Sequence, residues 1–226
     1  MTLSGEEAAH IVHVLRMGVG DAVTLFDGSG YDYAARITEV SKGAVTLEVI
    51  DKVFSVSEPR VKITLCQAVI KSDKFEYAVQ KCTEIGVTRI VPFLAERCVK
   101  KPKSEENFVG RARRIALEAC KQCGRSLVPE VTGVKRADEL REYFAGARVL
   151  LAYEKEQHTA IKEVLRGNKT EENLVIIIGP EGGFTEAEAQ GFSGEGAIQV
   201  SLGKLILRAE TAGVAASAMV MYEYEG

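Results

Sequence analysis

The sequence predicts an α/β protein with a small N-terminal antiparallel β unit and a larger C-terminal unit built on a parallel sheet. Over the first 60 residues, short apolar runs alternate with turn signals, as in small antiparallel units. From residue 61 onward, strand-like runs alternate with helix-like runs, which is typical of parallel α/β sheets. Near the C-terminus, two glycine-bearing loops each join a strand to a helix, and such loops form ligand sites at the carboxyl ends of strands.

The N-terminal unit is expected to hold a short helix at residues 6–15 and strands at 22–26, 31–40 and 44–49. Turn signals at residues 18–21, 27–30 and 41–43 separate these runs. A small β-barrel is the natural closure for such strands. Residues 55–60, which include Pro59, are the expected linker, so we predict domains at 1–58 and 59–226.

The C-terminal unit is expected to hold strands at residues 61–70, 89–94, 148–152, 174–178 and 197–200. Helices are expected at 74–85, 107–123, 137–144 and 158–165, and from residue 209 onward. A further helix should begin after Thr185, because residues 185–188 (Thr-Glu-Ala-Glu) fit a capping box. The chain contains no internal repeat and no low-complexity tract.

Charge is distributed unevenly along the chain. The net charge is −3, yet residues 97–125 contain nine basic and three acidic residues, which leaves −9 for the remainder. A local basic stretch on an acidic protein is compatible with an RNA-facing edge. A solvated loop and helix face would look the same, and charge alone does not separate the two.

The cysteine pattern and hydropathy indicate a cytoplasmic, reducing setting. The five cysteines do not form a secreted disulfide framework, and neither a signal peptide nor a membrane-spanning apolar run is present. We expect no bound metal, because His10 and His13 lack further ligands and the pair Cys120 and Cys123 lacks a second pair.

The first glycine loop, GPEGGFT, is not a nucleotide-binding P-loop, because it lacks the lysine and the hydroxyl residue of that motif. The chain also has no complete G-x-G-x-x-G, so a Rossmann dinucleotide site is not supported. By itself GPEGG is weak evidence for a site. Paired with the second loop, at residues 201–208, it becomes strong.

Six stretches together resemble the SPOUT methyltransferases, in particular the ribosomal RNA uracil-N3 methyltransferases (the RsmE family). GPEGGFTEAE at 179–188 and LGKLILRAETA at 202–212 are similar to the family's two signature loops, with Leu205 where arginine is usual. The others are KSDKFE at 71–76, with Ser72 in place of glycine, KCTEIG at 81–86, QCGR at 122–125 and HIVHVLR at 10–16. Relatives usually begin with one more strand before the equivalent of Leu3.

This resemblance implies a PUA-like RNA-binding barrel, followed by a SPOUT domain with a trefoil knot near residues 201–208. It implies a cofactor, S-adenosylmethionine (SAM), bound in a bent form by the two loops. Carried over residue by residue, one side comprises Gly179, Pro180, Glu181 and Gly182, and the other Ser201, Leu202, Gly203, Ile206, Leu207 and Arg208. Leu151 and Tyr153, at the end of a preceding strand, are expected to supply a third wall.

Arg208 is the predicted catalytic residue, because a fixed positive charge stabilises a uracil ring that loses its N3 proton. Glu210 and Thr211 are predicted helpers. The alternative is a structural role in which Arg208 closes the loop through an ion pair with Glu210. The sequence does not identify a general base.

Six basic residues are candidates for phosphate contacts, which position RNA without specifying its sequence: Lys71, Lys74, Arg97, Lys100, Lys101 and Arg125. The resemblance implies a substrate in 16S ribosomal RNA or the assembled small subunit, and a homodimer formed through the last helix. Two alternatives remain open. One is a SPOUT methyltransferase with another RNA target or acceptor atom, such as a ribose 2′-hydroxyl, and the other is a non-catalytic ribosome-assembly factor.

Overall fold

The computed structural model describes residues 1–55, 58–167 and 172–225, so part of the predicted linker, residues 56 and 57, lies outside it. The chain divides by its internal contacts into two units. One comprises Met1–Glu58 with Arg125–Leu127, and the other Pro59–Gly124 with Val128–Gly226. The first unit is therefore not one continuous segment, a feature that the sequence does not suggest.

The first unit is a four-stranded antiparallel sheet in the order β1-β4-β3-β2. Its elements are β1 (Thr2–Ser4), α1 (Glu6–Ala9), the π-helical η1 (His10–Val14), β2 (Ala22–Phe26), β3 (Tyr31–Ser41) and β4 (Ala44–Phe54). The predicted helix at 6–15 thus occurs as α1 followed by η1. Among the described residues β1 and β2 are the two edges of the sheet, and no pairing between them closes it into a barrel.

A small apolar core holds this sheet against α1. Ala8 and Ile11 pack on Ile37, Val45 and Leu47, which alternate with outward-facing residues along β3 and β4. β1 was not predicted, because three residues are too few to show the alternation that identifies a strand.

Residues 125–127 join this first unit through Glu58. The Glu58 carboxylate accepts hydrogen bonds from Arg125 Nη2 at 2.9 Å and from the backbone N–H groups of Ser126 and Leu127 at 3.0 and 2.9 Å. The side chains of Arg125 and Glu58 are only 4% and 5% exposed. The N–H of Gly30 donates to the carbonyl of Ser126 at 3.0 Å. Residues 125–127 are therefore an integral part of the N-terminal unit.

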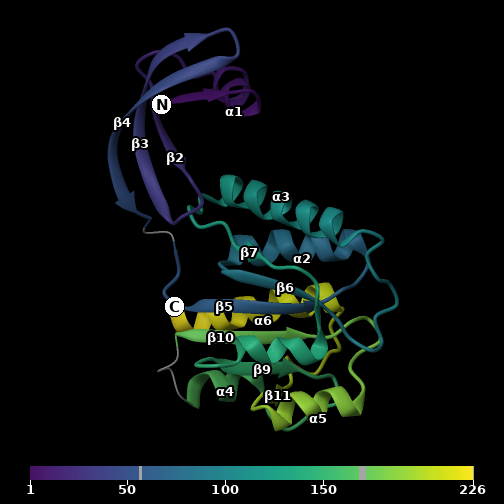
Figure 1. Ribbon diagram of the computed structural model, residues 1–226. Helices are drawn as coiled ribbons and strands as arrows, with labels where there is room; N and C mark the ends of the chain where they lie inside the picture. The colour runs from purple at the N-terminus through teal and green to yellow at the C-terminus, as the bar shows by residue number, and fades with distance from the viewer. Residues whose placement is uncertain (56–57, 168–171, 226) are drawn as a thin grey trace. The chain divides into compact units, whose positions relative to one another are not determined.

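The second unit contains a parallel sheet of seven strands in the order β11-β9-β10-β5-β6-β7, with β8 also paired to β6 (Figure 1). The strands are β5 (Lys62–Ala68), β6 (Arg89–Leu94), β7 (Glu130–Val131), β8 (Lys135–Arg136), β9 (Arg148–Ala152), β10 (Asn173–Ile178) and β11 (Ile198–Val200). The prediction of a parallel α/β sheet is confirmed. The trefoil knot stays a prediction, because strand pairing does not describe how the chain threads.

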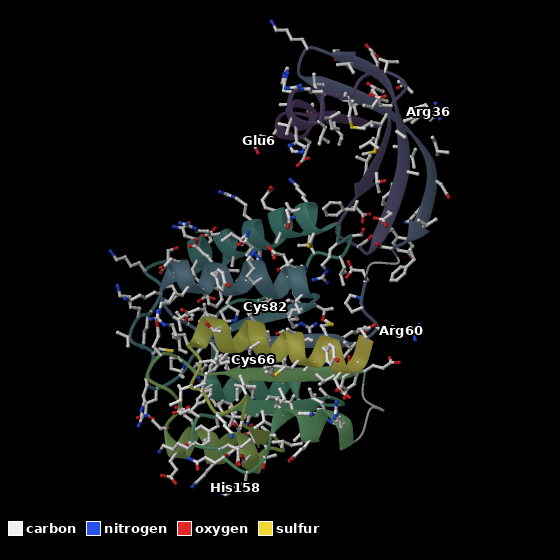
Figure 2. The ribbon with its side chains drawn as sticks, turned by 180° about the vertical axis from the view of Figure 1, so that it is seen from behind. Glu6, Arg36, Arg60, Cys66, Cys82 and His158 are labelled. Carbon is white, nitrogen blue, oxygen red and sulfur yellow. The ribbon has the colours of Figure 1, made fainter. Side chains whose placement is uncertain are left out.

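Helices cover both faces of this sheet. They are α2 (Ser72–Ile85), α3 (Glu105–Cys123), the 3-10 helix η2 (Ala137–Tyr143), α4 (Ile161–Gly167), α5 (Glu186–Gly194) and α6 (Ala209–Glu225). Ile63 and Leu65 of β5 face a core shared with α2, α3, α4 and α6, whereas Cys66 and Ala68 face η2 and α5. Figure 2 shows Cys66 on the sheet and Cys82 on α2 in the interior of this unit. Burial of both faces explains why these strands are continuous apolar runs.

Local signals place the helix ends. Gly86 and Gly124 adopt left-handed conformations directly after α2 and α3, where other residues are strained. Thr185 forms the predicted capping box: the N–H of Glu188 donates to Thr185 Oγ1 at 3.2 Å, and the N–H of Thr185 donates to Glu188 Oε2 at 2.9 Å. This box fixes the start of α5 just after the first glycine loop.

Candidate functional site

A cavity of about 1030 Å³ lies at the carboxyl ends of β9, β10 and β11. Because these strands are parallel neighbours, the loops that follow them emerge at the same edge of the sheet. The wall is built by residues of the segments 152–160, 178–183 and 200–208, together with Lys74, Ala209 and Ala212. The two predicted glycine loops therefore line one cavity.

The first loop, residues 179–183, is a tight turn after β10. The N–H of Gly183 donates to the carbonyl of Pro180 at 2.9 Å, and Gly183 has a φ of 68°, which favours glycine. A Cβ atom on Gly179 would lie 3.0 Å from the ring of Phe184, which is fully buried. The turn therefore needs small residues both for its backbone conformation and for its packing.

Arg97, from the loop after β6, donates hydrogen bonds to the main chain of this turn and of the residue that follows it. Its Nη1 donates to the carbonyl oxygen of Gly182 at 3.2 Å and to that of Phe184 at 3.4 Å. The neighbouring N–H of Glu96 donates to Glu188 Oε1 at 2.8 Å. Arg97 was predicted to contact RNA phosphate. In the structure its guanidinium contacts the main chain of the predicted cofactor loop.

The second loop, residues 201–208, is held more loosely. Ser201 Oγ donates to the carbonyl of Gly203 at 3.1 Å and accepts from its N–H at 3.3 Å, and Gly203 has a φ of 140°. Leu205 and Ile206 line the cavity, yet their side chains are 81% and 83% exposed. The six residues of this loop that were expected to bind the cofactor all line the cavity.

A third wall comes from the loop after β9. The Glu156 carboxylate accepts hydrogen bonds from the backbone N–H groups of His158 at 2.6 Å and Thr159 at 2.8 Å, which hold the pKa of Glu156 below its usual value. The N–H of Ser201 donates to the carbonyl of Thr159 at 2.8 Å and so joins this wall to the second loop. Sequence reasoning found Tyr153 but missed the remainder, although the sheet-edge rule could have indicated it.

The structure corrects the prediction for Leu151. Its side chain is fully buried in the core that also contains Phe184, and it does not line the cavity. Its neighbours Ala152 and Tyr153 do. Tyr153 faces the same core as Leu151 but lies just beyond the end of β9, so the position along the strand decides which of the two reaches the cavity. The apolar pattern therefore did not reveal which residues of this strand end face the cavity.

Lys74 also lines the cavity, although it was predicted to contact phosphate. Its Nζ lies 3.9 Å from Glu181 Oε1 and 3.7 Å from Glu210 Oε1. Its side chain is 23% exposed. The lysine is thus placed between the first glycine loop and the start of α6.

Of the three residues predicted to be catalytic, Arg208 lines the cavity and the other two do not. Glu210 pairs with Lys74, whereas Arg208 forms no ion pair within the described part of the chain. That arrangement disfavours the alternative in which Arg208 closes the loop through Glu210. Thr211 is exposed in the first turn of α6.

Lys71, Lys100 and Lys101 are exposed, as phosphate contacts require. Lys71 lies between β5 and α2, and the two other lysines lie between β6 and α3. Because β5 and β6 are parallel neighbours, both connections emerge at the edge of the sheet that carries the cavity.

Several of the other basic residues between 97 and 125 are already paired with carboxylates and are therefore less available for contact with RNA. The structure corrects the prediction for Arg125, whose buried guanidinium is paired with Glu58 and cannot reach a phosphate without breaking that pair. Arg111 Nε lies 2.7 Å from Glu76 Oε1, and Lys121 Nζ lies 2.9 Å from Glu118 Oε1. The loop around Lys100 and Lys101 therefore remains the best candidate for RNA contact in this stretch.

A second cavity of about 490 Å³ adjoins the first and shares Ala160 and residues 201–203 with it. Its other walls come from α4 and α6, and include Leu165, Met219 and Tyr222. Tyr222 is 78% exposed. Leu205 and Ile206, which line the first cavity, are exposed as well, so each cavity carries exposed apolar side chains.

In the described residues no three His, Cys, Asp or Glu side chains gather as a metal site would require. None of the helices in residues 1–55, 58–167 and 172–225 is both long and apolar enough to cross a membrane.

Comparison with known proteins agrees with the resemblance drawn from the motifs. Residues 57–221 match the RNA methyltransferase domain family, and residues 3–50 match the RNA methyltransferase PUA domain family. Ribosomal RNA small subunit methyltransferase E of Bacillus subtilis is 32% identical, over 99% of this chain and 90% of its own length. The protein of that name from Rickettsia conorii is 31% identical, over 96% and 88%.

The fold is also similar to a solved structure. The crystal structure of ribosomal RNA small subunit methyltransferase E from Neisseria gonorrhoeae, bound to S-adenosyl methionine, superposes with a TM-score of 0.88 at 30% identity. The match covers 99% of this chain and 92% of that one.

Proposed function

The chain belongs to the ribosomal RNA small subunit methyltransferase E family, and from this premise we propose that it methylates uracil N3 in 16S ribosomal RNA with SAM as the methyl donor. The observation that carries the proposal is the single cavity formed by GPEGG and by residues 201–208 at the carboxyl ends of parallel strands. The similarity extends over almost the whole length of the chain and of its relatives, so it includes both units.

The cavity fits SAM in size and chemistry. Its volume of about 1030 Å³ is at the upper end for small-molecule sites. Ile178, Val200 and Leu202 offer apolar surface to an adenine ring, and the turns at 179–183 and 201–203 bring main-chain donors and acceptors close. Glu154, Glu156 and Glu181 bring negative charge to the wall, which suits a cationic ligand. When bound, SAM supplies an electrophilic methyl group carried on a sulfonium sulfur.

Arg208 is the proposed catalytic residue. A neutral uracil is a poor nucleophile at N3, and it becomes a good one when the N3 proton leaves and negative charge spreads over the ring. The guanidinium of Arg208 is fixed in charge, lines the cavity and lacks an ion-pair partner in the described chain, so it is available to stabilise that anion. Glu210 and Thr211 are proposed as helpers in the adjacent first turn of α6.

RNA positioning is assigned to both units. The N-terminal unit would hold RNA as a PUA-like domain, since residues 3–50 match that family. Lys71, Lys100 and Lys101 would contact phosphates beside the cavity, because they are exposed on connections at its edge of the sheet.

A homodimer is proposed through α6 and the second cavity. Leu205 and Ile206 at the first cavity and Tyr222 at the second are exposed apolar side chains of the kind that a second subunit covers. Activity on ribosomal RNA also requires access to assembling ribosomes, so a cytoplasmic location is part of the proposal.

The test uses small ribosomal subunits that lack the modification. They are incubated with the protein and SAM, and the digested RNA is analysed by mass spectrometry. The expected product is 3-methyluridine, formed on the order of 100-fold more slowly by Arg208→Ala. Tight SAM binding without 3-methyluridine would refute the proposed acceptor, and a methylated ribose would identify another one.

A further inference from the structure

Lys74 stands between the two loops assigned to SAM, and we propose that it is a positioning residue that fixes the spacing of these loops. The inference rests on the proposed function of the same cavity. It differs from the expectation for Lys74 drawn from the sequence, which was a contact with RNA phosphate.

Three segments that are far apart in the sequence meet at this side chain. Lys74 lies in the first turn of α2, Glu181 lies in the loop after β10, and Glu210 lies in the first turn of α6. The Nζ atom of Lys74 is 3.9 Å from Glu181 Oε1 and 3.7 Å from Glu210 Oε1. One ammonium group therefore bridges the first cofactor loop to the helix that follows the second.

The three side chains are partly buried, so their ion pairs contribute more free energy than ion pairs on an exposed surface. The side chains of Lys74, Glu181 and Glu210 are 23%, 29% and 12% exposed. Glu210 Oε2 is buried and accepts no hydrogen bond within the described residues. A carboxylate in that position depends on a nearby cation, because an uncompensated charge is costly away from water. Lys74 supplies the cation.

The second loop needs such an anchor. Its own hydrogen bonds join Ser201 to Gly203, whereas Leu205 and Ile206 are exposed. Arg208 stands two residues before Glu210, so a shift of Glu210 moves Arg208 as well. Without the lysine, the carboxylates of Glu181 and Glu210 face each other uncompensated, and their repulsion drives the walls apart. Small errors in wall spacing weaken ligand binding and reaction geometry alike.

The first measurement is SAM affinity by calorimetry, in the absence of RNA. Lys74→Met is expected to weaken binding on the order of tenfold, a loss between that of an exposed ion pair and that of a fully buried one. Lys74→Arg keeps the charge and should retain most of the affinity. Lys81→Met is the matched control: it removes the same charge from α2, where Lys81 pairs with Glu84 at 2.8 Å and does not line the cavity.

A second measurement needs no cofactor. Hydrogen–deuterium exchange on the protein alone should be faster at residues 201–208 in Lys74→Met than in the unaltered protein, and unchanged in Lys81→Met. Lys74→Gln replaces the methionine variant if that variant does not fold. Glu210→Gln combined with Lys74→Met should weaken SAM binding by less than the product of the two single effects, because both changes break one bridge.

An unchanged SAM affinity and unchanged exchange in Lys74→Met would overturn the inference. A raised KM for RNA, with a shallower salt dependence and normal SAM binding, would overturn it too and make Lys74 a phosphate contact. Failure of the unaltered protein to bind SAM would instead count against the proposed function. In that case the exchange experiment still decides whether Lys74 holds the loops.

Discussion

Arg97 Nη1 lies 3.2 Å from the carbonyl oxygen of Gly182, so a basic side chain from the loop after β6 donates a hydrogen bond to the main chain of the turn after β10. The fit is close on both sides, because a Cβ atom on Gly182 would lie 3.1 Å from Arg97 Cβ. The same arginine donates to the carbonyl of Phe184. Arg97, which the sequence suggests as an RNA contact, thus supports the main chain of a turn that lines the first cavity.

Arg97→Ala should therefore weaken SAM binding. Removal of a charged donor from two carbonyl groups typically costs on the order of 1–3 kcal/mol, and part of that loss should appear in the turn. Calorimetric titration with SAM measures the change. Lys100→Ala is the matched control, since Lys100 is exposed in the same loop: it should raise the KM for RNA and leave SAM affinity as it was. Equal SAM affinity in both variants would contradict the assignment.

Gly183→Ala should destabilise the protein and weaken SAM binding. Gly183 has a φ of 68°, which costs other residues roughly 1–2 kcal/mol, and its added Cβ would collide with the Glu154 carboxylate. Urea unfolding gives the free-energy change. Gly191→Ala is the opposite case, because Gly191 lies within α5 with nothing within 4 Å of an added Cβ. That variant should gain about 0.5–1 kcal/mol.

Glu58→Gln should lower the free energy of unfolding by about 3 kcal/mol or more, since it breaks an ion pair in which both side chains are buried. The double variant with Arg125→Met should recover part of the loss, because the buried charge is then absent. Glu130→Gln is the control. It breaks an exposed pair with Arg89, which has a 2.7 Å contact, and should cost less than about 1 kcal/mol. Similar losses for both single variants would show that burial of the Glu58 pair does not matter.

Cys66 and Cys82 should resist thiol reagents in the folded protein. Burial raises the pKa of the Cys66 thiol far above its ordinary value and that of Cys82 to about 12. At pH 8 a thiol with that pKa is ionised to about one part in ten thousand, and the thiolate is the reactive form. Labelling with Ellman's reagent should modify the half-buried Cys98 and Cys123 before the others, more slowly at Cys98 because burial raises its pKa, and should reach Cys66 and Cys82 only in denaturant. Rapid labelling of either buried thiol under native conditions would refute this.

The regular elements of the second unit could be predicted because each has a long and consistent pattern. β6 and β9 have the predicted limits, and α2 and α3 each begin two residues before the predicted start. β7 and β8 were not predicted, because a strand of two residues is too short to show the alternation of apolar and polar residues. The two glycine loops were found from their composition, and parallel strands do bring them to one cavity.

Side-chain partners could not be predicted in the same way. Arg125 was placed on an RNA surface because neighbouring residues are basic, whereas its buried partner Glu58 lies 67 residues earlier. Lys74 was grouped with Lys71, but its partners Glu181 and Glu210 come from distant segments. A run of basic residues shows only which charges are neighbours along the chain, and does not show which acidic residue each one pairs with. Burial and long-range ion pairs depend on the tertiary fold.

The separation of Glu58 from residues 125–127 has a consequence for the order of events during synthesis. Sixty-seven residues must be added after Glu58 before Arg125 exists, which takes roughly 3–13 seconds at about 5–20 residues per second. Through this interval the nascent N-terminal sheet lacks the Ser126 carbonyl that receives the N–H of Gly30 and the two N–H groups that Glu58 accepts from. The N-terminal unit therefore cannot complete its contacts until more than half of the chain, up to Leu127, has been synthesised.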